Sequence, residues 1–128
     1  MLGIDVAIGE SAEATVTVTP KDTATSFRSG DVDVLSTPRL VALLEQATVA
    51  VTDAKLPPEY TSVGVRVEID HVSPARIGET VDAHATLEGI DGSTLTFVVS
   101  AQVGDRVIGK GRIVRVVADR SRFEGSIS

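Results

Sequence analysis

The sequence contains no cysteine and few aromatic residues. Without cysteine, disulfides, thiolate metal sites and cysteine nucleophiles are excluded. Aromatic residues make up 3% of the chain, with no tryptophan, which leaves no platform of rings for stacking single-stranded nucleic acid. The 12 basic residues are outnumbered by 18 acidic ones, a net charge of -6. This balance argues against binding of nucleic acid or an anionic membrane through bulk charge.

Long apolar runs and the common catalytic motifs are also missing. The longest apolar tract, around residues 40–51, is interrupted by Glu45 and Gln46 and is shorter than the roughly 20 residues of a membrane span. The first ten residues lack the basic segment of a secretory signal, so we expect a cytoplasmic location. No spacing of His, Asp and Glu suits a metal, and no serine elbow, phosphate loop or dinucleotide fingerprint occurs. Neither a metal nor a bound cofactor is expected.

The length predicts one compact domain over residues 1–128, and one segment predicts its only long helix. Residues 39–54 are apolar on nearly all sides. They follow Thr37 and Pro38, where a hydroxyl can cap the helix and a proline loses no hydrogen bond at its first position. A helix that is apolar all round should be buried. The preceding residues 20–33 predict an extended loop, in which Phe27 is the one large apolar residue.

The rest of the chain predicts β-structure. Segments rich in Val, Ile and Thr predict strands at residues 13–19, 61–72, 80–90, 94–103 and 106–117. Asp91-Gly92 predicts a type I′ hairpin turn, and Gly104-Asp105 predicts a second hairpin, so the last three strands should be antiparallel.

This element order predicts an α+β fold with one long central helix. A helix that is apolar around most of its circumference must be wrapped by a curved sheet, here an antiparallel sheet of about five strands, which is the hotdog arrangement. Such a sheet leaves an edge strand that a second copy can pair with. We therefore expect at least a homodimer, and a dimer of dimers stays open.

Two residues stand out as candidates for chemistry. Glu45 lies among apolar helix neighbours, and a buried carboxylate is costly unless it is paired or used, for example as a general base. Alternatively it lies on a wet stripe of the helix beside Gln46, with no role. His71 ends a strand in which it shares parity with Val63, Val65, Val67 and Ile69. An inward histidine there can polarise a carbonyl or orient water, unless it is only a core or rim residue.

Three stretches match a known family. They read Gly30-Asp-Val-Asp-Val-Leu-Ser-Thr-Pro-Arg-Leu-Val-Ala-Leu-Leu-Glu45, Ser62-Val-Gly-Val-Arg-Val-Glu-Ile-Asp-His71 and Pro74-Ala-Arg-Ile-Gly-Glu-Thr-Val81. With them the chain, over about residues 15–123, resembles the fluoroacetyl-CoA thioesterase-like family of hotdog thioesterases. The resemblance implies hydrolysis of an acyl-CoA thioester to a free acid and CoA, with CoA as part of the substrate rather than a cofactor.

The resemblance also implies site residues. A helix-start threonine, a glutamate eight residues later and a histidine 26 residues after it correspond to Thr37, Glu45 and His71 as the catalytic set. Gly64 should line the acyl pocket and Arg115 should lie near its mouth. Further substrate contacts are expected from Pro38 and Phe27, and the CoA phosphates should meet the basic last strand at Arg106, Lys110 and Arg112. Whether Glu45 acts as base or nucleophile stays open.

Two further features of the sequence bear on the acyl specificity and on the arrangement of subunits. The fluoroacetyl-specialised relative covers its acyl group with phenylalanines, where this chain has Arg28 and Asp31, so a short or medium acyl group is expected. Thr37 and Glu45, eight residues apart, are separated by roughly 12 Å along a helix axis. They either serve two ends of one substrate or come from different subunits.

Two other functions are alternatives to hydrolysis. One is a non-catalytic acyl-CoA binding module, against which Glu45 and His71 argue. The other is a hotdog enoyl-CoA hydratase, whose Asp-x-x-x-x-His pair is only approximated by Glu79 and His84.

Overall fold

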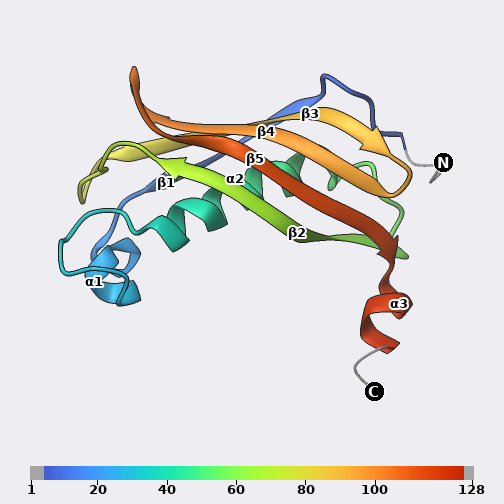
Figure 1. Cartoon of the computed structure of the whole chain (residues 1–128), viewed down its shortest axis with the longest axis horizontal. Coiled ribbons are helices and arrows are strands. Elements are labelled where there is room, and N and C mark those ends of the chain that lie inside the picture. Colours follow the sequence, from blue (N-terminus) through green and yellow to red (C-terminus); the bar gives the residue numbers. More distant parts are fainter. Residues whose placement is uncertain (1–4, 126–128) are drawn as a thin grey trace.

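The structure, a computed structural model that describes residues 5–125, contains five strands and a central helix (Figure 1). The elements in chain order are β1 (Ser11–Thr17), η1 (Pro20–Asp22), α1 (Ala24–Phe27), α2 (Thr37–Thr52), β2 (Tyr60–His71), β3 (Thr80–Asp91), β4 (Thr94–Val103), β5 (Arg106–Asp119) and α3 (Arg120–Gly125). One antiparallel sheet of order β1-β3-β4-β5-β2 curves over α2. The predicted hotdog arrangement is confirmed. Within residues 5–125 no helix has the length and apolarity to cross a membrane.

The central helix is buried on one side only. Its buried residues pack mainly against β1 and β3 and include Leu40, Leu43, Leu44, Ala47 and Val51. The opposite side, with Gln46, Val49 and Ala50, is exposed. The prediction of a helix enclosed all round is therefore wrong for a single chain, because the sheet covers one face and leaves an apolar stripe open.

The start of α2 differs from the prediction by one residue. The N-cap is Ser36, whose Oγ accepts a hydrogen bond from the Arg39 amide at 3.1 Å. Thr37 is the first helical residue, so its predicted capping role is wrong. The correction matters because a threonine that does not cap the helix keeps its hydroxyl available for another partner.

The loops and turns are more regular than predicted. Residues 20–33 contain two short helices, η1 and α1, in place of an extended loop. Both hairpins are confirmed, but the first has another turn type. Asp91 pairs with Thr94, and Gly92, with φ of +60°, is the only turn residue with positive φ. Positive φ at the first central position alone is the requirement of a type II′ turn, not type I′.

A bulge in β2 changes which side chains face the helix. Gly64 pairs with Arg115 and Arg66 pairs with Val114, which leaves Val65 as an additional residue. Because a bulge reverses the alternation, Gly64 faces α2 while Val63 lies on the opposite face of the sheet. The prediction that these residues share one face is correct for Val67, Ile69 and His71 and wrong for Val63.

Candidate functional site

Thr37 and His71 meet where α2 begins and β2 ends. Thr37 Oγ1 lies 2.7 Å from His71 Nδ1. The other ring nitrogen, Nε2, is buried and has no hydrogen-bond partner among the described residues. Burial lowers the pKa of His71 below its usual value, although the Ser73 backbone opposes this. The imidazole is therefore neutral near pH 7, with one buried nitrogen whose hydrogen-bonding capacity is unused within the described chain.

Glu45 forms a second centre with a buried arginine. Its Oε2 accepts a hydrogen bond from Arg115 Nη1 at 3.3 Å. Arg115 is buried and donates from Nε to Ser62 Oγ at 3.0 Å and from Nη2 to Ser62 O at 3.1 Å. Burial lowers the pKa of Arg115 and Glu45 opposes the shift, yet a guanidinium stays charged at neutral pH. The pairing holds the carboxylate in one direction.

The burial predicted for Glu45 is incomplete. Its side chain is 37% exposed, on the same open stripe of α2 as Gln46. It borders a hollow of about 390 Å³, lined by Ala42, Glu45, Gln46, Val49 and Arg115. The carboxylate is thus paired by Arg115 and also faces space that a substrate can enter.

Gly64 lies so close to this carboxylate that a side chain there would displace it. A Cβ atom there would lie 2.7 Å from Glu45 Oε2 and 3.5 Å from Arg115 Nη1. The bulge at Val65 is what directs this position toward α2. Gly64 therefore borders the carboxylate centre, at the position where an acyl pocket wall was predicted.

The two centres do not join within one chain. Thr37 and Glu45 are eight residues apart on α2, or about 12 Å along its axis. A glutamate side chain does not span that distance to reach the imidazole of His71, which is bonded to Thr37. Each chain therefore carries two separate halves of the predicted catalytic set.

The amides at the start of α2 offer little for an oxyanion. Pro38, exposed beside Thr37, has no amide hydrogen, and the Arg39 amide is bonded to Ser36. The start of α2 therefore supplies no row of free amides. Within the first turn the candidate donors are the amide and hydroxyl of Thr37.

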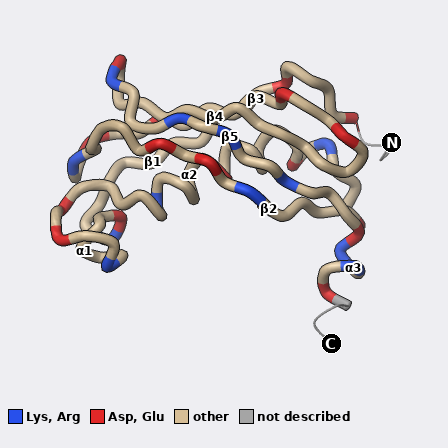
Figure 2. Tube along the Cα trace, in the orientation of Figure 1, with Lys and Arg blue, Asp and Glu red and all other residues tan. Residues whose placement is uncertain are grey.

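The basic residues of β5 do not gather at these centres. Lys110 pairs across the sheet with Ser100, in one row with His84 on the face away from α2. Arg112 shares that face and binds Glu88 at 2.9 Å. Charges of both signs lie along β2 and β5 (Figure 2). The structure thus directs Lys110 and Arg112 away from the candidate site.

Arg106 and Phe27 lie nearer the Thr37 end of the molecule. Arg106 Nη2 contacts both oxygens of Glu79, at 2.8 and 3.0 Å, and also donates to Pro74 O. Phe27, in α1, is 44% exposed. The hydratase-like pair is not formed, since Glu79 binds Arg106 and His84 binds Glu13 at 3.1 Å.

Two contributors were not predicted from the sequence. Ser62 fixes Arg115, and buried Asp22 binds Arg39 Nε at 3.0 Å just after Thr37. Neither residue stands in a motif of its own. The only signal for Ser62 is its spacing of two from Gly64, which reveals a shared face on a strand.

Comparison with known proteins identifies the family of the chain. The family model described as fluoroacetyl-CoA-specific thioesterase matches residues 18–121. The fluoroacetyl-CoA thioesterase of Streptantibioticus cattleyicolor is 30% identical over 95 residues, which cover 74% of this chain and 68% of that protein. A solved structure of a fluoroacetyl-CoA thioesterase superposes with a TM-score of 0.89 at 26% identity, covering 95% of both chains. A thioesterase superfamily member from Thermus thermophilus gives a TM-score of 0.88 at 26% identity, covering 95% of this chain and 90% of that one. The chain belongs to the fluoroacetyl-CoA-specific thioesterase family.

Proposed function

We propose that the protein hydrolyses an acyl-CoA thioester to a free acid and CoA, in a site assembled from two copies of the chain. One observation carries the proposal: Thr37 orients His71 so that its buried Nε2 has no partner in the described chain, while Glu45 is held about 12 Å away along α2. A second copy can bring these two halves together.

The free edge of β2 supports the two-copy arrangement. β2 pairs with β5 on one side only, and Val67 on its α2 side is 42% exposed. Antiparallel pairing of two β2 edges about a two-fold axis through Glu68 keeps matching faces together and, across the bulge at Val65, would set Gly64 of one copy opposite His71 of the other. Since Gly64 adjoins Glu45, the carboxylate would then face the imidazole of the second chain.

In this site each group has a chemical task. Glu45, aimed by Arg115, removes a proton from water, whose oxygen bonds to the thioester carbon, or it attacks that carbon itself. The Thr37 hydroxyl donates to His71 Nδ1, so that the neutral ring carries its hydrogen on Nε2. That N–H stabilises the developing oxyanion, and the proton that Glu45 removed from water passes to the CoA sulfur when the C–S bond breaks.

The acyl group is proposed to be short or medium in length. The hollow beside Glu45 holds about 390 Å³ and opens along the exposed stripe of α2. The segment that precedes α2 presents exposed Arg28 and Asp31, which form no apolar cover over a small fluoromethyl group. These features favour tolerance of several acyl chains over selectivity for fluoroacetyl-CoA.

The test is hydrolysis of acyl-CoA thioesters from acetyl to long-chain, with fluoroacetyl-CoA included. Released thiol is read with a disulfide dye, to which a protein without cysteine adds no background. Turnover that is lost in Glu45→Gln and His71→Asn supports the proposal. Glu88→Gln is the matched control, because Glu88 lies with Arg112 on the other face of the sheet. If wild-type protein binds these thioesters and turns none over, the protein is a binding module instead.

A further inference from the structure

A shallow opening leads to His71 from the end of the molecule. It encloses about 240 Å³ and is lined by Val34, His71, Val72, Ser73 and Pro74. Val72 on its rim is 53% exposed, which is unusual for a valine beside a polar pair. Thr37 is the first residue of α2 and His71 is the last residue of β2, and both lie at this end of the molecule. A thioester arm that reached His71 through this opening would pass apolar side chains.

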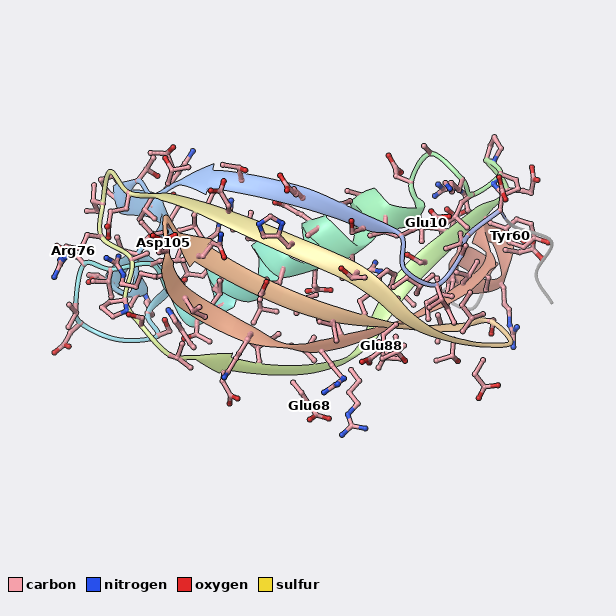
Figure 3. The ribbon with its side chains drawn as sticks, turned by 90° about the horizontal axis from the view of Figure 1, so that it is seen from above. Glu10, Tyr60, Glu68, Arg76, Glu88 and Asp105 are labelled. Carbon is pink, nitrogen blue, oxygen red and sulfur yellow. The ribbon has the colours of Figure 1, made fainter. Side chains whose placement is uncertain are left out.

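Arg76 lies beside this opening on a fixed backbone. It forms an isolated bridge with Val34, and its amide donates to Glu79 Oε1 at 2.8 Å. The neighbouring Ala75 carbonyl accepts from the Leu35 amide at 2.8 Å. Figure 3 shows the Arg76 side chain at the tip of the molecule, pointing away from the sheet. The base of the side chain is held while its guanidinium projects outward.

The guanidinium of Arg76 forms no ion pair or hydrogen bond with a carboxylate among residues 5–125, although its charge is near enough to contribute to the lowered pKa of Glu79. Between residues 5 and 125 no ion pair involves Arg76, while Arg106 occupies both oxygens of Glu79 and Arg39 is bound to Asp22. Asp33, next to Val34, is exposed and forms no ion pair in the described chain either. Of the arginines around this opening, Arg76 has its charge available for a ligand.

We infer that Arg76 binds a phosphate group of the CoA moiety. This rests on the proposed function, in which the thioester lies against His71. Arg76 follows His71 by five positions, which corresponds to at most about 18 Å of extended chain. A pantetheine arm can span that distance. A guanidinium suits phosphate oxygens because it donates two parallel hydrogen bonds. In a chain of net charge -6, a free cation at the opening also offsets repulsion of a polyanionic substrate.

Arg76 is better placed for the CoA phosphates than the basic residues predicted on the last strand. Lys110 and Arg112 point to the face of the sheet away from α2, and Arg106 is bound to Glu79. Arg76, by contrast, stands at the same end of the molecule as His71, on the loop that follows it.

The experiment compares two substrates that carry the same acyl group. One is the acyl-CoA and the other is the acyl thioester of N-acetylcysteamine, which has no phosphate. Arg76→Gln should raise KM about fivefold for the acyl-CoA, the effect of one exposed charge pair, and leave KM for the short thioester unchanged. Lys110→Gln is the matched control, because Lys110 is an exposed cation on the face of the sheet away from α2. It should behave as wild type with both substrates.

Calorimetric titration with coenzyme A itself gives a second readout that needs no turnover. Arg76→Gln should weaken CoA binding about fivefold relative to wild type and Lys110→Gln. Equal CoA affinity of the three proteins, or a KM that rises equally for both substrates, would overturn the assignment. Loss of turnover in all proteins with this affinity difference retained would instead refute the hydrolase proposal and leave the phosphate site standing.

Discussion

Thr37 and His71 form a 2.7 Å contact between Oγ1 and Nδ1, which joins the first residue of α2 to the last residue of β2. Because Ser36 takes over the capping of α2, the Thr37 hydroxyl is free to make this contact. The contact orients the plane of the imidazole. A threonine that pattern alone assigns to helix capping thus orients a histidine.

Removal of this hydroxyl should lower catalysis without unfolding the protein. Thr37→Val keeps the shape of the side chain at an exposed position, and we expect kcat to fall by about tenfold, the effect of one lost hydrogen bond to a reacting group. Thr37→Ser keeps the hydroxyl and should stay within about threefold of wild type. Steady-state kinetics measures both. A Thr37→Val variant with the kcat of wild type would show that the contact has no part in turnover.

The pH dependence should report His71. Burial lowers the pKa of His71 in the folded protein below 6.5, so the neutral, active ring persists somewhat below that pH. We expect kcat/KM to fall on the acid side only, with a midpoint below 6.5. An acid limb centred above 6.5 would contradict the burial of the free ring.

Stability should follow the same group. As pH falls through 6.5 the unfolded chain takes up a proton that folded His71 resists, so the free energy of unfolding decreases until the folded pKa is passed. Denaturant unfolding between about pH 7.5 and 5 should show this decrease in wild type and a smaller one in His71→Asn. Equal slopes in the two proteins would remove His71 as the cause.

Gly64→Ala should displace the carboxylate. The added methyl group would lie 2.7 Å from Glu45 Oε2, and the flexible end of Glu45 can move away at little cost in stability. We therefore expect a near-normal melting temperature with kcat/KM lowered by at least about tenfold. Gly89→Ala is the matched control, since its Cβ would meet only Thr96 at an ordinary 3.8 Å. Full activity in Gly64→Ala would show that the position of Glu45 is not critical.

Asp22 should stabilise the segment that leads into α2. Burial acts to raise its pKa, but the amide and hydroxyl of Thr19 and the guanidinium of Arg39 outweigh it and hold the pKa below the usual value. Asp22→Ala should cost about 1–3 kcal/mol, because these donors lose their acceptor. Asp91→Ala, at an exposed turn, should change the free energy of unfolding by less than about 0.5 kcal/mol. Similar small losses in both variants, measured by chemical denaturation, would contradict a structural role for Asp22.

The sequence pattern predicts the elements well and their local exceptions poorly. The apolar run before Pro57 predicts α2, and β-branched alternation predicts the strands to within one or two residues at most ends. Alternation cannot reveal the extra residue at Val65, so it wrongly places Val63 on the face of His71. The bulge depends on pairing with β5, which is a tertiary contact and leaves no mark in the period of two.

The candidate site shows the same limit. Glu45 and His71 stand out as polar residues in apolar segments, and the family resemblance adds Thr37, Gly64 and Arg115. Their contacts could not be predicted from sequence, because residues 62, 45 and 115 come together only when β2 and β5 pair over α2. The separation of Thr37 and Glu45 follows from their spacing on one helix, whereas the contact of His71 with Thr37 depends on how β2 ends beside α2.

Mixing two inactive variants tests the two-copy site most directly. Dimers are formed from equal amounts of His71→Asn and Glu45→Gln chains, each inactive alone. About half of the dimers are then mixed, and one of the two sites in each has both His71 and Glu45 intact, so about a quarter of wild-type acyl-CoA hydrolysis should return. If His71 and Glu45 of the same chain formed each site, every site would carry one substitution. No recovery of activity in mixed dimers would then contradict the account.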